Sequence, residues 1–258
     1  MIKFQSFLSG SSGNATFVTD DSVSLLVDCG TNGKYITECM RRIGASPESL
    51  SGILITHEHR DHIAGAGVLS RKYNVPIYAT EKTWAAIGDS IGSVREENRC
   101  ITEQEMDFGE LCVRSFSIPH DAGDPVGYSF LTDNHKFTIA TDLGHITKEV
   151  EENLSGSDAV IIEANHDVDM LNHGKYPFYL KKRILGNLGH LSNKNCGALC
   201  ARLAKSGTCS FWLGHLSAEN NLPSLAYETV SNVLHNEGLT VGNGISLNVL
   251  PKYWISQE

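Results

Sequence analysis

The segment 57–62, which reads His-Glu-His-Arg-Asp-His, contains the residue types that point most clearly to chemistry. It follows the apolar run 52–56, so we expect a buried strand to carry it at its carboxyl end. His57 and His59 share a face in an extended chain, whereas Asp61 and His62 come where the chain turns toward a helix. Two neighbouring groups of nitrogen and oxygen ligands suit a pair of divalent metals such as zinc or manganese. A polar loop is the alternative, but eleven histidines in 258 residues make a chance match to this spacing rare.

Three later side chains of the same kind each end an apolar run. They are His120, Asp142 and His215. The carboxyl ends of strands converge on one edge of a sheet, where α/β proteins commonly place their active sites. Any one of these residues is as often an ordinary polar residue at the end of a strand as part of a site. Three residues with the same placement favour a common site.

The elements that must position these residues form early hairpins followed by strand–helix units. The expected strands are 3–7, 16–18, 23–28, 53–56, 76–79, 111–118, 126–131, 136–141, 159–163 and 209–213. The expected helices are 34–43, 64–73, 81–91, 148–154, 194–205, 224–236 and one that starts at Tyr176. This order predicts an α/β fold in which two mixed sheets pack face to face and helices flank them, an αββα sandwich. Residues 1–258 contain no repeat or linker-like stretch, so we expect a single domain.

The composition is that of a soluble globular enzyme, with 41% hydrophobic and 20% charged residues. No apolar run is long enough to cross a bilayer, and the first residues lack the layout of an export signal. The seven cysteines are odd in number and include no Cys-x-x-Cys motif, as in a reducing compartment. We therefore expect a cytoplasmic protein without a membrane partner.

The formal net charge of −9 argues against a general surface for polyanions. It does not exclude a nucleic-acid substrate, because bound metals would add positive charge at the site. A basic cluster also runs from Lys175 to Arg183. A phosphate-ester substrate would have to depend on that local field.

In chain order, the His and Asp residues resemble the ligand set of the metallo-β-lactamase superfamily, and the match spans almost the whole sequence. The resemblance implies two divalent metals, one held by His57, His59, His120 and Asp142, and the other by Asp61, His62, Asp142 and His215. Asp142 would bridge them together with a hydroxide. Asp28 matches the superfamily's early Asp-x-Gly, in which the Asp supports the ligands from behind. Sites of this kind accept zinc, manganese and iron.

The turn at residues 9–14, Ser-Gly-Ser-Ser-Gly-Asn, offers hydroxyl and backbone N–H groups that could cradle a phosphate. Ser/Gly hairpins are common in themselves. This one resembles the amino-terminal turn of the ribonuclease Z and cyclic-phosphodiesterase branch of the superfamily. We therefore expect contacts to substrate from Ser9, Ser11, Ser12 and Asn14.

The segments 161–166 and 189–193 resemble the parts of ribonuclease Z in which a Glu and a His deliver a proton. By this resemblance His190 would protonate the leaving oxygen, and Glu163 would orient His190 and stabilise its charge. The alternative is that His190 is only a polar residue ahead of the next helix, which Ser192 or Asn193 would cap.

Three neighbours of this pair are further candidates. Ser192 and Asn193 are expected to contact substrate, although Asn193 and Asn165 depart from the ribonuclease Z pattern. His166 is a secondary candidate for contact with metal or substrate.

Aromatic and basic residues alternate in the segment 172–183. Such a pattern suits stacking on bases and binding of phosphates, here by Lys181 and Arg183. The equal alternative is an ordinary helix with a solvated basic face. Together with the segments around His190 and His215, this run resembles the WalJ/YycJ-type exonucleases of bacteria, which act on DNA from the 5′ end.

We therefore expect a two-metal phosphodiesterase, a 5′-to-3′ exonuclease whose partner is a DNA end. Asp61 would help to orient the attacking water, and His190 would be the general acid. The closest alternative is a phosphodiesterase for small or cyclic nucleotides, which the acidic net charge favours. Hydrolysis of a thioester or lactam and a non-catalytic metal-dependent binding role are the remaining alternatives.

Overall fold

Two β-sheets form the centre of the structure, a computed structural model that describes residues 1–255. The first sheet has six strands in sequence order: β1 (Lys3–Leu8), β2 (Ala15–Thr19), β3 (Ser24–Val27), β4 (Gly52–Leu54), β5 (Ile77–Ala79) and β6 (Arg99–Ile101). The second has seven, in the order β13-β12-β11-β10-β9-β8-β7: β7 (Glu105–Phe108), β8 (Leu111–Ser117), β9 (Val126–Leu131), β10 (Lys136–Ala140), β11 (Ala159–Glu163), β12 (Ser210–Gly214) and β13 (Ser246–Val249).

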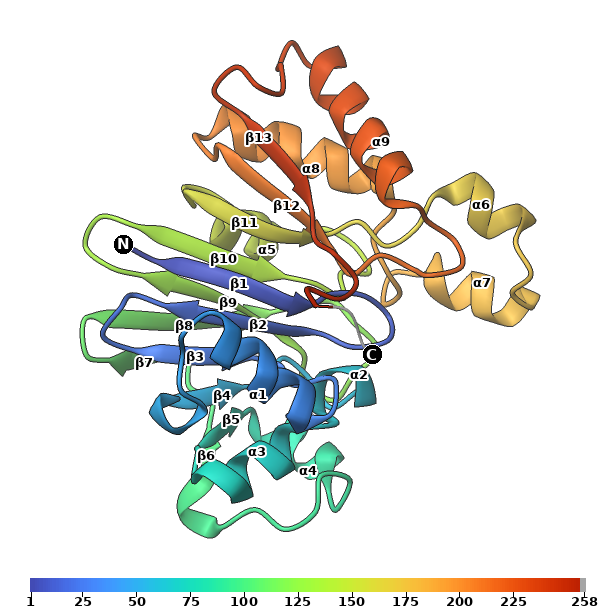
Figure 1. The fold of residues 1–258 in the computed structure, drawn as a ribbon. Helices are drawn as coiled ribbons and strands as arrows, with labels where there is room; N and C mark the ends of the chain where they lie inside the picture. The colour runs from blue at the N-terminus through green and yellow to red at the C-terminus, as the bar shows by residue number, and fades with distance from the viewer. Residues whose placement is uncertain (256–258) are drawn as a thin grey trace.

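Helices cover the outer face of each sheet, as Figure 1 shows. Beside the first sheet lie α1 (Gly33–Arg42), α2 (Arg60–Ile63), α3 (Ala66–Tyr73) and α4 (Glu81–Ile87), with the short helices η1 (Pro47–Ser49) and η2 (Glu96–Asn98). Beside the second lie α5 (Lys148–Leu154), α8 (Asn193–Lys205) and α9 (Pro223–Asn236). Between β11 and α8 the chain forms α6 (Val168–His173) and α7 (Phe178–Ile184). The predicted αββα sandwich is confirmed.

Strands buried on both faces hold the layers together. In β3, Leu25 and Val27 join the core between the two sheets, whereas Leu26 packs into the core beneath the helices of the first sheet. In β11, Ile161 joins the core between the sheets, and Ile162 faces the helix side of the second sheet. Because side chains alternate between faces, a strand buried on both sides needs a continuous apolar run. Strands β4, before His57, and β10, before Asp142, have this character, whereas β8, before His120, leaves one face partly exposed.

The direction of the strands explains why the candidate residues meet. Strands β3 to β6 are parallel to one another, and so are β10 to β13. Strand β8 runs the same way as β10, since both are antiparallel to β9. The carboxyl ends of β8, β10, β11 and β12 therefore lie at one edge of the second sheet.

Several short elements escaped the sequence analysis. The strands β6, β7 and β13 and the helices α2 and α6 were not expected, and none has more than six residues. The missed strands lie at sheet edges, where the buried faces that produce a clear apolar pattern are incomplete. The helix expected to reach Ile91 ends at Ile87, because Gly88 adopts a positive φ of 50°.

No helix within residues 1–255 combines the length and the apolar character that crossing a bilayer requires.

Candidate metal centre

Loops at the carboxyl ends of four strands bring the predicted ligands together. His57 and His59 follow β4, and α2 carries Asp61 and His62 directly after them. From the second sheet, His120 follows β8, Asp142 follows β10 and His215 follows β12. All seven predicted ligands fall into overlapping groups whose ligand atoms lie within 4.8 Å of one another. The sequence therefore identified a set of residues that the fold does assemble.

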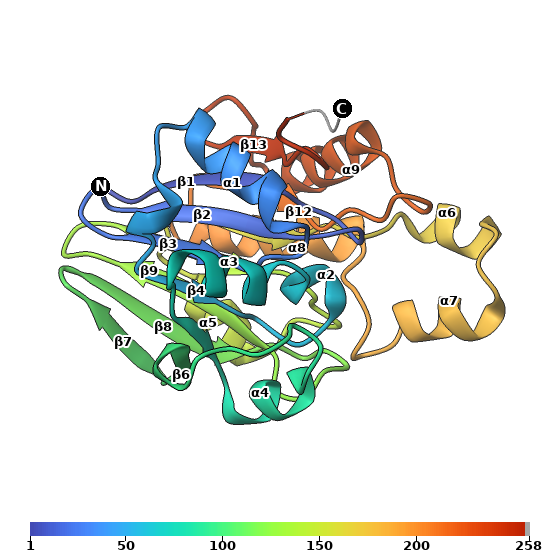
Figure 2. The ribbon, with the colours of Figure 1, turned by 60° about the horizontal axis from the view of Figure 1, so that its bottom comes forward.

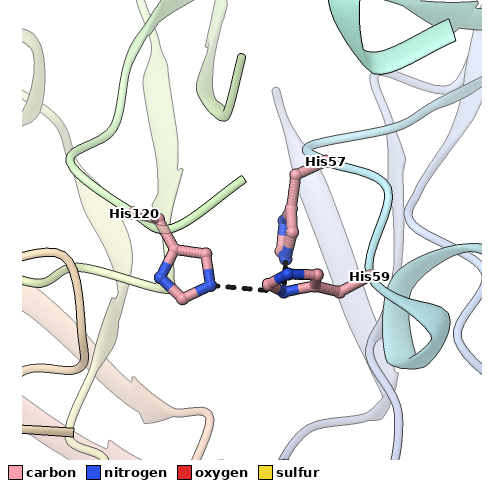
Figure 3. Close-up of side chains that lie close together, drawn as sticks. All are labelled: His57, His59 and His120. Carbon is pink, nitrogen blue, oxygen red and sulfur yellow. Dashed lines mark hydrogen bonds between the residues drawn. The ribbon is translucent and has the colours of Figure 1, made fainter. Parts of the chain in front are cut away.

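The first group consists of His57, His59 and His120. Figure 3 shows the three rings turned toward one another, with His120 approaching from a separate loop. His57 Nε2 lies 3.0 Å from His59 Nδ1, and His120 Nε2 lies 3.4 Å from the same His59 nitrogen. Three imidazole nitrogens at these distances can act together as ligands of one cation.

The second group consists of Asp61, His62 and His215. Asp61 Oδ2 lies 3.7 Å from Nε2 of His62 and 3.7 Å from Nε2 of His215. Both imidazoles are buried, whereas the Asp61 side chain is 28% exposed. Asp61 therefore closes the group on the side that solvent reaches.

Asp142 faces both groups. Its Oδ1 lies 3.6 Å from His120 Nε2, and its Oδ2 lies 3.3 Å from His62 Nε2. The residue is held at a φ of 59°, and His215 at 54°, in the left-handed region that ordinary side chains rarely adopt. Such backbone strain is typical of functional sites, where the surrounding structure imposes it.

Two buried atoms of this cluster fit a bound cation. Asp142 Oδ2 and His215 Nε2 have no hydrogen-bond partner among the described residues. Buried polar atoms are normally paired, because an unpaired one loses its interactions with water without compensation. A divalent metal bound by these acceptor atoms would provide that compensation.

The pKa shifts of the histidines in the cluster also fit a bound cation. Burial and the neighbouring imidazoles of His62 and His120 hold the pKa of His57 well below its usual value. Burial also opposes the charged form of His62, but the carboxylates of Asp28 and Asp142 raise its pKa to about 9. The carboxylates thus favour positive charge within the cluster. The imidazoles cannot all be protonated, because neighbouring positive charges repel one another.

Asp28 supports His62 from behind. Its Oδ2 lies 2.7 Å from His62 Nδ1, which directs Nε2 of His62 into the cluster. Asp28 Oδ1 accepts the backbone N–H of Thr56 at 2.9 Å, and the Thr56 hydroxyl lies 3.0 Å from His57 Nδ1. The sequence analysis placed Asp28 but missed Thr56, whose position immediately before the first His was the available signal.

Glu163 is fully buried at the end of β11 and contacts two histidines. Its Oε1 lies 2.9 Å from His190 Nδ1 and 2.7 Å from His215 Nδ1. Its Oε2 accepts the backbone N–H groups of Leu143 and Leu191. Burial by itself raises the pKa of Glu163, but the neighbouring His190 and His215 hold it below its usual value. Glu163 is therefore placed as a carboxylate that orients both rings.

His190 lies at the edge of the cluster. Its side chain is 17% exposed, whereas those of His62, His120 and His215 are at most 2% exposed. Burial lowers the pKa of His190, but the carboxylate of Glu163 outweighs it and raises the pKa above its usual value. With Nδ1 directed at Glu163, the Nε2 atom of His190 is the one available to a bound molecule.

Comparison with known proteins identifies the family. A model described as the Beta-lactamase superfamily domain matches residues 24–211. The chain belongs to the metallo-β-lactamase superfamily.

Two curated members of this superfamily are similar over nearly their whole length. The exodeoxyribonuclease YycJ of Bacillus anthracis is 39% identical over 249 residues, which cover 96% of this chain and 94% of that protein. The exodeoxyribonuclease WalJ of Streptococcus pneumoniae (strain D39) is 43% identical, over 93% of this chain and 91% of that protein. The chain belongs to the same family as these two proteins. Among solved structures, the metallo-β-lactamase fold protein YhfI of Bacillus subtilis superposes with a TM-score of 0.70 at 15% identity, over 98% of each chain, and shows the fold.

In this member of the superfamily, the predicted substrate turn divides into two pairs of residues. Ser9 Oγ accepts the backbone N–H of His215, and Asn14 accepts the N–H of Gly10 and lies 3.0 Å from His62 Nε2. Both are buried and hold the loops of the centre in place. Ser11 and Ser12 are exposed and line, with Ser9, a cavity of about 270 Å³ beside the loop that follows His215.

The residues expected near His190 are mostly engaged within the protein. Ser192 accepts the N–H of Asn195 and caps α8, and the Asn193 amide donates to Asn221. His166 is buried and belongs to none of the groups of candidate ligands. Neither of its ring nitrogens is paired within residues 1–255, and burial lowers its pKa to about 4. The capping role that the alternative interpretation gave to Ser192 or Asn193 is therefore filled by Ser192, and Asn193 is engaged with Asn221.

The two residues of α7 that were predicted to bind phosphate also have partners. Lys181 donates to the carbonyl of Asn172, and Arg183 pairs with Asp121 through two hydrogen bonds, at 2.5 and 3.0 Å. Asp121 was missed by the sequence analysis although it directly follows the ligand candidate His120. Asp121 Oδ1 lies 3.4 Å from His120 Nε2. Asp121 therefore connects Arg183 to a predicted metal ligand.

Proposed function

We propose that this chain is a dinuclear-metal phosphodiesterase that degrades DNA from an end, in the 5′-to-3′ direction. The two curated relatives that it matches over more than nine-tenths of its length are both named exodeoxyribonucleases. The arrangement of the site supports the same class of reaction.

The observation that carries the proposal is the pair of Glu163 and His190 beside Asp142. His190 Nδ1 lies 2.9 Å from Glu163 Oε1 and 3.7 Å from Asp142 Oδ1. A proton donor at this place suits phosphodiester cleavage, in which an alkoxide leaves and needs a proton. Hydrolysis of a thioester or lactam at a metal centre does not require such a dyad.

Two divalent metals are the cofactor that the ligand geometry favours. One would be held by His57, His59, His120 and Asp142, and the other by Asp61, His62, Asp142 and His215. Asp142 presents one oxygen to each group, which suits a bridging carboxylate. Zinc or manganese fits this set of nitrogen and oxygen ligands, and iron is a further possibility. When bound, such a pair supplies a nucleophile at neutral pH and stabilises charge on the attacking and leaving oxygens.

The protein's own groups would then divide the proton transfers. Asp61, the more exposed acid of the cluster, orients the attacking water. His190 donates its Nε2 proton to the 3′ oxygen as the bond between that oxygen and phosphorus breaks. Glu163 keeps the His190 ring in position and stabilises its charged form before the transfer. Water then restores the proton from the open side of His190.

One assay separates the candidate functions. Purified protein with manganese is offered 5′-labelled and 3′-labelled duplex DNA, bis-p-nitrophenyl phosphate and a thioester. We expect labelled mononucleotide to appear first from the 5′-labelled DNA. Cleavage of the small diester with DNA left intact would instead favour the small-nucleotide phosphodiesterase, which the acidic net charge makes the second candidate. Hydrolysis of the thioester alone would reject both.

A further inference from the structure

The helices α6 and α7 and the chain between them, residues 168–184, form an arm that stands away from the two sheets. Both ribbon views show the arm projecting from the edge of the molecule (Figures 1 and 2). Within its two helices only Leu171 and Ile184 are buried. An element with so few core contacts does little to stabilise the sandwich, so its sequence is free to serve another purpose.

Two consecutive aromatic side chains of the arm are in contact with solvent. Phe178 is 82% exposed and Tyr179 is 75% exposed. Phenylalanine and tyrosine normally gain stability by leaving water, and neighbouring exposed aromatics usually mark a binding surface. The exposed pair therefore needs a partner that offers flat apolar faces or an apolar pocket.

The charge of this part of the chain indicates which partner. Between Met170 and Ala218 the sequence has no Asp or Glu but seven Lys or Arg, although the whole chain has a net charge of −9. Within the arm, Lys175 and Lys182 are exposed, and neither forms an ion pair within residues 1–255. Aromatic faces combined with free cations match the bases and phosphates of a nucleic-acid strand.

The base of the arm is attached to the metal centre. Arg183, in the last turn of α7, pairs with Asp121 beside His120. The backbone N–H of His190 donates to the carbonyl of Ile184, and the carbonyl of Gly189 lies 3.1 Å from His120 Nδ1. The arm is thus held against the same two histidines that border the site.

The periodicity of α7 orients the aromatic pair. Residues four apart share a helix face, so Tyr179 lies one turn before Arg183 on the face that contacts Asp121. Phe178 precedes Lys182 in the same way on the adjoining face. On each of these two faces, an aromatic ring is followed one helical turn later by a cation, in the direction of the metal centre.

From these observations we propose that the arm binds an unpaired stretch of the DNA substrate, with bases stacked on Phe178 and Tyr179 and phosphates held by Lys175 and Lys182. This inference rests on the proposed nuclease function and adds a substrate preference to it. In a duplex the base faces are hidden in the helical stack, so exposed aromatics can stack only on unpaired bases or on a frayed end. The arm should favour single-stranded or overhanging ends over fully paired ones.

The test compares the manganese-loaded wild-type enzyme with the double variant Phe178→Ala/Tyr179→Ala. KM and kcat are measured on a single-stranded oligonucleotide and on a blunt duplex of the same sequence. Each base that stacks on an aromatic ring contributes to binding of the strand. We therefore expect KM for the single strand to rise roughly ten- to hundredfold, with kcat within about threefold. KM for the blunt duplex should change much less. Tyr227→Ala, a partly exposed aromatic on α9, is the matched control and should change neither constant.

The lysines are tested separately by salt dependence. For Lys175→Gln/Lys182→Gln, the slope of log affinity for the single strand against log salt should fall by about 0.7 per lysine. Lys72→Gln on α3 is the control for a surface lysine elsewhere. An unchanged slope would remove the phosphate contacts from the proposal.

The outcomes distinguish this inference from the function on which it rests. If wild type leaves DNA intact, the proposed function fails. If wild type degrades DNA and the aromatic double variant does so with an unchanged KM for the single strand, only the inference about the arm is overturned. Sedimentation and flotation with anionic vesicles complete the test. Loss of self-association or of vesicle binding in the variant, with KM unchanged, would assign the pair to a second copy or to a lipid surface instead.

Discussion

The carboxylate of Glu163 lies 2.7 Å from Nδ1 of His215, closer than it lies to His190. The sequence analysis assigned Glu163 to the proton donor alone. The structure shows one buried carboxylate that orients a candidate metal ligand and the candidate general acid together. Under the proposed function, this carboxylate would couple metal binding to proton delivery, and mutation should separate the two roles.

His190→Ala should lower turnover while leaving metal binding intact. His190 is the most exposed histidine around Glu163, and its removal deletes the proton donor but no member of the two predicted ligand sets. General acid catalysis typically contributes about a hundred- to ten-thousandfold, so we expect kcat to fall within that range. Metal content measured by elemental analysis should equal that of wild type. Loss of metal in this variant would make His190 a ligand and overturn its assigned role.

Glu163→Gln should impair both functions. The neutral amide cannot stabilise a positive charge on His190, so the pKa of His190 should fall. A general acid must be protonated, so the alkaline limb of the kcat profile should move to lower pH. Because His215 also loses the negative charge of its carboxylate partner, metal affinity should fall about ten- to hundredfold. A profile and a metal affinity identical to those of wild type would contradict the coupling. Glu237→Gln at the surface provides the control.

Asp28→Asn should weaken metal binding without removing a ligand. Asp28 lies 2.7 Å from His62 Nδ1 and directs the opposite ring nitrogen into the cluster. Partners of this kind typically contribute about ten- to a hundredfold to metal affinity. Competition with a chromogenic chelator measures the effect, and Asp21→Asn, which changes an exposed acid, should leave the affinity unaltered. Equal affinities for both variants would show that His62 needs no such support.

Gly30→Ala should destabilise the fold at the centre itself. A Cβ at Gly30 would lie 1.6 Å from the backbone oxygen of Asp61, and backbone cannot move aside as a flexible side chain can. Overpacking of this kind costs about 1–3 kcal/mol and occasionally more, and we expect the upper end of that range. Urea unfolding of the metal-free protein gives the measurement. At Gly123 the nearest atom to a new Cβ is 3.4 Å away, so Gly123→Ala should be tolerated. Equal stability of the two variants would refute the argument.

The sequence alone identified the residues of the centre because of where they stand relative to apolar runs. An apolar run is easily recognised, and His57, His120, Asp142 and His215 each follow one. Parallel strands then bring their carboxyl ends to one edge of a sheet whatever the exact register. Short edge strands such as β6 and β13 lack buried faces on both sides, so no comparable signal marked them.

What the sequence determined by itself was therefore the candidate ligands and the layered fold, because both follow from local patterns along the chain. Which atoms share a partner was decided by the tertiary structure. Only the packing of β11 against β12 places Glu163 between His190 and His215, residues 27 and 52 positions away. Only the fold shows that Arg183 is paired with Asp121 and that Phe178 and Tyr179 face solvent. Burial and pairing depend on neighbours distant in sequence, and no local pattern contains that information.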